Sequence, residues 1–256
     1  MARPSYQCTV LTLSKTKLGE SDLIITGLKQ DGSLLRGVAK GARKPTNPFA
    51  SRLDIFSISE CLLAKGKNLD VFSEARAVQP NLNVREDIAL SMASYPIVQA
   101  LSKTCQEGIE APRVFEMTKM ALSTMDSSTA ENAPSITAAF LLKLIALQGF
   151  RPSLTHCACC GEEIDLTQLS SGVSFSYLDG GSMCEACAHV LDVVHVPAAT
   201  LAWCQTLMMS TFKDILDLRV TPDVSFEVLQ VCQGWLRQNM GLNLKSLNAM
   251  FTYGLW

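Results

Sequence analysis

The chain has 256 residues, of which 48% are hydrophobic and 18% are charged, so it can bury a core and lacks the composition of a disordered protein. Its most apolar stretch, residues 138–150, contains Lys143 and Gln148 and is shorter than the about 20 apolar residues that a membrane span needs. The N-terminal residues lack the continuous apolar run of a signal peptide. We therefore expect a cytoplasmic protein with no membrane-spanning segment.

Charge is distributed unevenly along the chain. The formal net charge is only −2, but residues 1–80 carry 12 Lys and Arg against 7 Asp and Glu, a net +5. The remaining residues carry a net −7. This asymmetry predicts two domains, a basic one over 1–80 and an acidic one over 81–256.

Turn residues divide the first domain into five apolar segments rich in β-branched residues. We expect strands over 7–13, 22–28, 34–39, 53–64 and 69–75, with a hairpin turn at Lys65–Asn68. Five short strands with one longer loop after the third are typical of the oligonucleotide-binding (OB) barrel. An SH3-like barrel would give nearly the same pattern.

After Pro80 the apolar residues recur every three or four positions, which indicates helices. Expected helices are one that starts near Asn83 and is kinked or broken at Pro96, then 112–125, the strongly apolar 135–148, and two that follow Pro197 and Pro222. The fold class is therefore α+β, with a barrel followed by a helical domain.

Two Cys-x-x-Cys pairs lie in the second domain. Cys157 and Cys160 form the first, Cys184 and Cys187 form the second, and 23 residues separate them. Two such turns supply the four corners of a zinc tetrahedron, and the alternating residues between them indicate a strand and turn that bring the pairs together. We expect an insertion over about 153–192 that binds one structural Zn²⁺, because four thiolates leave no open position for a substrate.

The sequence also allows other ligands and other roles for the cysteines. Cys159, His156 and His189 are close enough in sequence to compete as ligands. Four unrelated core cysteines, or a redox-active pair, would also explain the spacing. The remaining five cysteines lie in apolar patterns and are expected in the core. They are Cys8, Cys61, Cys105, Cys204 and Cys232.

A basic loop follows the third expected strand. No acidic residue occurs from Ser33 to Leu53, whereas cations are frequent there and in the next hairpin turn. Such clusters neutralise phosphates and release counterions, so we expect this surface to bind DNA. Gly37 and Gly41 would let the backbone approach a ligand, and Phe49 and Phe56 are candidates for base stacking, although Phe56 also fits a core position. The predicted DNA-binding cations are Arg36, Lys40, Arg43, Lys44, Arg52, Lys65 and Lys67.

Motifs of common enzyme classes are missing from the sequence. It contains no phosphate-binding loop, dinucleotide fingerprint, zinc-protease helix or nucleophile elbow, and its three histidines lie beside no obvious nucleophile. We therefore expect no catalytic residue and no enzymatic activity.

Several segments together resemble the RecO family of bacterial recombination mediators. The resemblance lies in Gly19–Asp22 leading into a strand, in Val38–Lys44, in the two cysteine pairs with Gly180–Gly181 before the second, and in Leu244–Ser246. It implies an OB barrel joined to a helical domain with a zinc-binding insertion. It also implies that the protein binds single- and double-stranded DNA, anneals complementary strands and works with RecR to load RecA onto DNA coated by single-strand-binding protein.

Carried onto this sequence, the resemblance assigns DNA binding to Arg36, Lys40, Arg43 and Lys44, and metal binding to the four paired cysteines. Some members lack the zinc cysteines, whereas this chain has all of them. The alternative function is a zinc-containing scaffold for protein partners that does not itself bind DNA.

Overall fold

A computed structural model describes residues 4–168, 172–189 and 192–256. The chain forms two compact units, residues 1–127 and 128–256. The first unit holds all five strands of the N-terminal barrel and the three helices that follow them. Of the expected zinc-binding insertion, residues 169–171 and 190–191 lie outside the described part of the chain.

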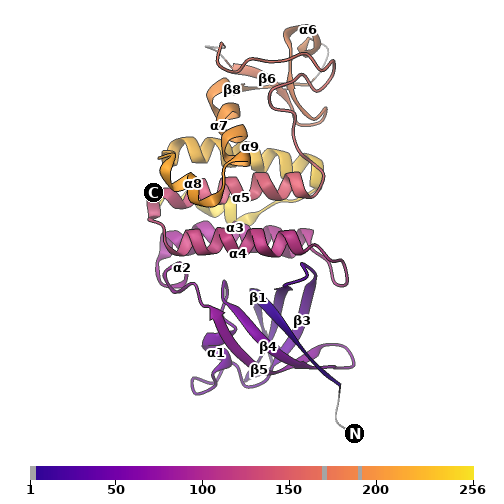
Figure 1. The fold of residues 1–256 in the computed structure, drawn as a ribbon, viewed down its shortest axis with the longest axis vertical. Coiled ribbons are helices and arrows are strands. Elements are labelled where there is room, and N and C mark those ends of the chain that lie inside the picture. Colours follow the sequence, from indigo (N-terminus) through magenta and orange to yellow (C-terminus); the bar gives the residue numbers. More distant parts are fainter. Residues whose placement is uncertain (1–3, 169–171, 190–191) are drawn as a thin grey trace. The chain divides into compact units, whose positions relative to one another are not determined.

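The N-terminal strands close into a barrel in the order β1-β2-β3-β5-β4, as Figure 1 shows in indigo and purple. Neighbours are antiparallel except β3 and β5, which run parallel, and pairing of β1 with β4 closes the ring. Five strands with such a crossover form the Greek-key barrel of the OB fold, as expected. The strands are Ser5–Leu18 (β1), Asp22–Lys29 (β2), Leu34–Ala39 (β3), Ile58–Ala64 (β4) and Asp70–Gln79 (β5).

The fourth strand begins five residues later than the sequence predicted. Residues Phe49–Arg52 form a helical turn, α1, and Phe56 has φ +72°, a value that strands exclude. Leu53 and Phe56 are nevertheless buried, at 0% and 2% exposure. The apolar run therefore signalled burial, of Leu53 in the barrel core and of Phe56 against Tyr95, and the expectation of a strand over 53–57 was wrong.

The barrel interior is filled mainly by aliphatic side chains. Val10, Ile25, Leu63 and Phe72 all belong to this cluster. A Cβ at Gly37 would lie 2.7 Å from the Phe72 ring, so glycine is required there by core packing. The expectation that Gly37 admits a ligand is therefore wrong.

Three helices complete the first unit. The Asp87 side chain accepts from the Leu90 N–H and caps the start of α3, which continues through Pro96 without a break. The expected start near Asn83 instead belongs to a separate short helix, α2. Asp54, just before β4, accepts from Lys15 on β1 and from Arg85 on α2. The helices are Leu82–Glu86 (α2), Ile88–Thr104 (α3) and Pro112–Asp126 (α4).

Helix α5 forms the centre of the second unit. It contacts α7, α8 and α9, and its side chains are buried on nearly all sides. Residues 130–147, which include it, are the one described segment long and apolar enough to cross a membrane, but 67% of that segment is buried inside the protein. This helix is therefore part of a protein core.

The remaining elements of the second unit are a short sheet and further helices. The sheet has the order β7-β6-β8. The short helices α8 and α10 were not expected from the sequence. The elements are Ala130–Asn132 (η1), Ala133–Leu147 (α5), Gly172–Ser176 (β6), Gly181–Met183 (β7), Glu185–Ala188 (α6), Val194–Pro197 (β8), Ala198–Met209 (α7), Phe212–Asp217 (α8), Pro222–Met240 (α9) and Lys245–Tyr253 (α10).

Candidate metal centre and nucleic-acid surface

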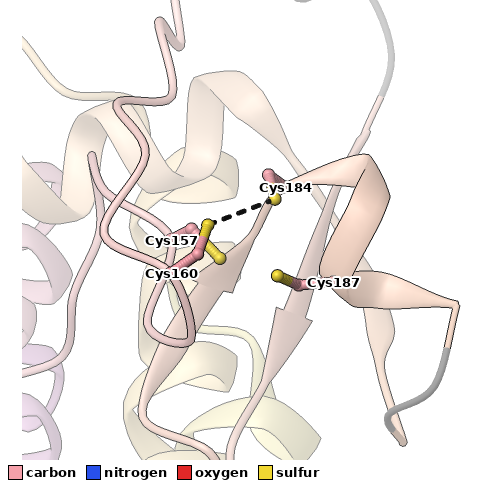
Figure 2. A group of neighbouring side chains, drawn as sticks. All are labelled: Cys157, Cys160, Cys184 and Cys187. Atoms are coloured by element: carbon pink, nitrogen blue, oxygen red, sulfur yellow. Dashed lines mark hydrogen bonds between the residues drawn. The ribbon is translucent and has the colours of Figure 1, made fainter.

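Four thiols converge at one end of the small sheet (Figure 2). The Sγ atoms of Cys157, Cys160, Cys184 and Cys187 all lie within 4.8 Å of one another. The Sγ atoms of Cys160 and Cys184 are 3.7 Å apart. A tetrahedron with Zn–S bonds of about 2.3 Å has S···S edges of about 3.8 Å. The spacing of the thiols therefore fits a four-thiolate metal site.

Each cysteine pair lies on its own tight turn. In the first, the Gly161 N–H donates to the Cys157 carbonyl at 2.9 Å, and Gly161 has φ +81°, which glycine adopts without strain. In the second, Cys184 precedes α6 and its carbonyl accepts from the Cys187 N–H at 3.1 Å. Both turns direct their thiols toward a common point, which is the arrangement that a four-thiolate metal site requires.

Strand β7 holds the two turns together. The Ala158 N–H donates to the Ser182 carbonyl at 2.8 Å, and Ser153 forms a parallel bridge with Gly181. A Cβ at Gly181 would lie 2.1 Å from the Ser153 carbonyl oxygen, and its φ is +143°. Only glycine allows this approach, so the Gly180–Gly181 pair sets the distance between the two turns.

Aromatic side chains attach the cysteine-bearing sheet to helix α9. The rings of Phe175 and Trp235 are 5.8 Å apart, and the Asn239 side chain donates to the Tyr177 carbonyl at 2.9 Å. Gly234 faces the Tyr177 ring, where a Cβ would lie 2.6 Å away. Order at the thiol cluster is thus coupled to the helical core of the second unit.

The thiols of the cluster differ in pKa. Burial raises the pKa of the Cys157 thiol, but N–H groups of Cys160, Cys184 and Cys159 favour the thiolate and lower the pKa to about 6. Hydrogen bonding with the thiols of Cys184 and Cys160 raises the pKa of Cys187. One thiolate forms readily and disfavours the next, and a divalent cation at the centre would remove this conflict.

The competing ligands weighed in the sequence analysis lie outside the group of four. Among the described residues, the cluster whose ligand atoms lie close enough to hold a metal ion contains neither His156 nor His189. Cys159 is exposed and is not part of it either. Of the other five cysteines, four are buried and Cys8 is half-buried against the barrel core.

The predicted basic surface lies on β3 and on the connection that follows it. Arg36 is exposed on β3, and Lys40 and Lys44 are exposed in the connection that follows β3. In the described part of the chain, no ion pair within 4.0 Å involves any of these three residues. Their charges are therefore available to an outside anion.

This loop is held to the β1–β2 turn. The Asp22 carboxylate accepts from the Gly41 N–H at 2.8 Å, and the Arg43 guanidinium donates to the Gly19 carbonyl at 2.9 Å. Hydrogen bonds from Gly41 and Ser21 lower the pKa of Asp22. Sequence reasoning assigned Asp22 no role, although it ends the Gly19–Asp22 segment that carries part of the family resemblance. The carboxylate positions the basic loop from a neighbouring turn.

The other predicted cations have different surroundings. Arg52 donates to the Ala75 carbonyl at 3.0 Å and lines a cleft of about 1130 Å³ with Phe49 and Arg76. Neither Arg36 nor any of the cations in the 40–44 loop lines this cleft.

The hairpin lysines also differ from the loop cations. Lys65 is paired with Asp70 at 3.3 Å and lies 4.4 Å from the Tyr6 ring centroid. Lys67 is exposed in the same turn. The bridge from Gly37 to Asp70 places the start of β5 beside the strand of Arg36. Phe56 is buried and unable to stack on a base.

Known protein families match both parts of the chain. The family described as recombination protein O N terminal matches residues 1–81, and that described as recombination protein O C terminal matches residues 85–248. The chain belongs to the RecO family. Members of this family are DNA repair and recombination proteins that act as mediators and not as enzymes.

Individual relatives agree over nearly the whole length. The chain is 25% identical to the DNA repair protein RecO of Dehalococcoides mccartyi strain 195 over 89% of its own length and 88% of the relative's. It is 26% identical to the DNA repair protein RecO of Desulforamulus reducens over 96% of its own length and 93% of the relative's. The RecO protein of Thermoanaerobacter sp. strain X514 is 24% identical over 92% and 93%.

Proposed function

We propose that this RecO-family chain binds single- and double-stranded DNA, anneals complementary strands and, together with RecR, helps to load RecA onto single-stranded DNA coated by single-strand-binding protein. It acts in the cytoplasm at the nucleoid and contacts RecA indirectly. The observation that carries the proposal is the OB barrel with exposed cations on β3 and the loop after it, none of which forms an ion pair with another described residue.

The DNA path follows Arg36, Lys40, Arg43 and Lys44, with Lys67 of the β4–β5 turn extending it. Cations at these positions neutralise backbone phosphates and release counterions, which gives affinity without sequence preference. Neutralised strands repel each other less, which favours their annealing. Lys65 is paired with Asp70, and Arg52 lines the cleft that the loop cations do not line, so both contribute less to this path.

The four-cysteine centre binds one Zn²⁺ per chain with a structural role. Cys157, Cys160, Cys184 and Cys187 hold the ion, which supplies folding free energy and no chemistry because the four thiolates fill its coordination sphere. The acidic remainder of the chain, with net charge −7 after residue 80, disfavours a DNA path there and leaves it for protein partners.

Anisotropy of a labelled single-stranded oligonucleotide, titrated over a range of salt, tests the DNA proposal. Changing Lys40, Arg43 and Lys44 together to Ala removes three phosphate contacts. We expect the slope of log K against log salt to become less negative by about 2, since each contact on a single strand contributes roughly 0.7. Annealing of complementary strands is expected to be lost.

The matched control changes three exposed cations outside the barrel, Lys103, Arg113 and Lys119, to Ala. Both variants lower the net charge by the same amount, so only the loop variant is expected to alter the salt dependence. An unchanged slope in the loop variant contradicts the assigned path. Absence of binding by the unaltered protein, even at low salt, favours the zinc-containing scaffold instead.

A further inference from the structure

The basic loop, residues 40–48, is closed on itself by one side chain. The Asn47 amide nitrogen donates to the Lys40 carbonyl at 3.0 Å, and the Asn47 amide oxygen accepts from the Phe49 N–H at 2.9 Å. Lys40 is the first residue after β3, and Phe49 is the first residue of α1. One amide group therefore joins the two ends of the connection that carries Lys40, Arg43 and Lys44.

Backbone hydrogen bonds fold the loop between these two ends. The Lys44 N–H donates to the Gly41 carbonyl at 2.9 Å, and the Asn47 N–H donates to the Lys44 carbonyl at 3.0 Å. Gly41 has φ +66°, and a Cβ added there would lie 3.0 Å from the Asn47 Nδ2 atom. The Asn47 side chain thus lies against the glycine at the start of the loop, in agreement with its bond to Lys40.

The loop is also anchored to the barrel. The Arg43 N–H donates to the Ser21 carbonyl at 2.9 Å, in addition to the bonds of Gly41 and Arg43 with the β1–β2 turn. Ala42 is 2% exposed and belongs to the buried core cluster of the barrel. Arg43 and Lys44, which follow it, are exposed. The backbone of the loop is therefore fixed while its charged side chains remain accessible.

We propose that Asn47 is a positioning residue for DNA binding, which holds the basic loop in one conformation before DNA is bound. The inference rests on the proposed function, since the loop is the assigned DNA path. Asn47 is uncharged and neutralises no phosphate itself. Its two hydrogen bonds order the loop during folding, so less conformational entropy is lost when DNA binds.

Loss of Asn47 and loss of a cation should affect the salt dependence differently. Removal of one phosphate contact on a single strand makes the slope of log K against log salt less negative by roughly 0.7. A loop that is disordered before binding still brings the same cations to the DNA, but ordering it costs free energy at every salt concentration. Loss of Asn47 should therefore lower log K uniformly and leave the slope unchanged.

The test measures oligonucleotide anisotropy over a range of salt with the full chain and its variants. We expect the affinity of Asn47→Ala to fall about fivefold at every salt concentration, the effect of losing hydrogen bonds of ordinary strength. Lys40→Ala, the charge comparison, should instead change the slope by roughly 0.7. Thr46→Ala is the matched control and should bind as the unaltered protein. Thr46 is an exposed neighbour in the same loop, and its side chain makes no hydrogen bond to the described residues.

Hydrogen exchange of the free protein gives a readout that does not depend on DNA. In Asn47→Ala the amides that donate within the loop, those of Lys44 and Phe49, should exchange several-fold faster than in Thr46→Ala. The amides of β2 should exchange equally slowly in both variants, which shows that the barrel remains folded.

A slope that changes in Asn47→Ala as much as in Lys40→Ala would overturn the proposal, because Asn47 would then be needed for a phosphate contact. Equal affinities of Asn47→Ala and Thr46→Ala, or equal exchange of their loop amides, would overturn it as well. Absence of DNA binding by the unaltered protein contradicts the proposed function instead. In that case hydrogen exchange alone decides whether Asn47 orders the loop.

Discussion

The thiol centre and the basic loop show two ways in which a chain builds a site. At the centre, four side chains on two short turns meet at one point, and the Cys160–Cys184 separation of 3.7 Å matches a metal tetrahedron. At the loop, exposed cations follow one another along a single connection, and a carboxylate on another strand holds their backbone. A closed metal site requires fixed distances between its ligand atoms, whereas a phosphate-binding surface requires only positive charge and solvent access. The first is therefore the more sensitive to single substitutions.

Removal of one ligand should have the largest effect. We expect Cys157→Ser to abolish stoichiometric zinc binding and to destabilise the second unit by several kcal/mol, a part of the ~10 kcal/mol that zinc contributes in small zinc domains. Zinc content and thermal unfolding measure both effects. The neighbouring Cys159→Ser serves as control and should keep the metal. Full zinc occupancy in Cys157→Ser would show that the centre is not closed by these four thiols.

A smaller effect on the same centre is expected from Gly181→Ala. The new Cβ would meet the Ser153 carbonyl and adopt an unfavourable φ, so we expect a loss of about 2–4 kcal/mol and weaker zinc binding. Gly161→Ala, also at positive φ but with open space around it, should cost only about 1–2 kcal/mol. Urea unfolding of both variants makes the comparison. Equal losses would show that the close approach at Gly181 is unimportant.

A second charge cluster in the first unit consists of Asp54 paired with Lys15 and Arg85, in contrast to the unpaired cations of the basic loop. Burial raises the pKa of Asp54, but Lys15 and Arg85 outweigh it and hold the pKa below the usual value. Asp54→Asn should therefore destabilise the first unit at neutral pH by about 1–2 kcal/mol, less than a fully buried pair because the side chain is 31% exposed.

The pH dependence of this effect has a definite sign. A carboxylate with a depressed native pKa stabilises the fold above its unfolded pKa, and the contribution is lost as the pH falls through its native pKa. The difference in the free energy of unfolding between the unaltered protein and Asp54→Asn should thus be constant from pH 7 to about 5 and disappear below about pH 4. Urea midpoints at several pH values check this. A difference that persists at low pH would assign the loss to packing instead of charge.

The smallest effect is expected at the basic loop itself. Asp22→Asn keeps an oxygen that accepts from Gly41 and removes a negative charge beside Lys40 and Lys44, so DNA affinity should stay equal or rise slightly. Asp22→Ala also removes the acceptor, so the loop should be less ordered and the affinity lower than in Asp22→Asn. Oligonucleotide anisotropy at fixed salt compares them. The reverse order of affinities would argue against positioning by the Asp22 carboxylate.

Much of the fold followed from local patterns in the sequence. Alternating apolar residues and turn signals located β2 and β3 to within one residue, and the 3.6-residue period located α4 and α5 to within two. These predictions succeeded because such signals depend on backbone preferences over a few residues. The apolar residues before β4 led to a wrong prediction of strand, because burial alone does not distinguish a strand from a buried turn.

For the candidate sites, the sequence alone determined the residue types. The Cys-x-x-Cys spacing is local geometry on one turn, so it identified the thiols before any fold was known. Only the tertiary structure decided that the second turn meets the first at metal-binding distance. It likewise revealed that Asp22 supports the loop from another strand and that Phe72 fills the space beside Gly37. These contacts join residues far apart in the chain, and their positions depend on strand pairing and core packing that local sequence does not encode.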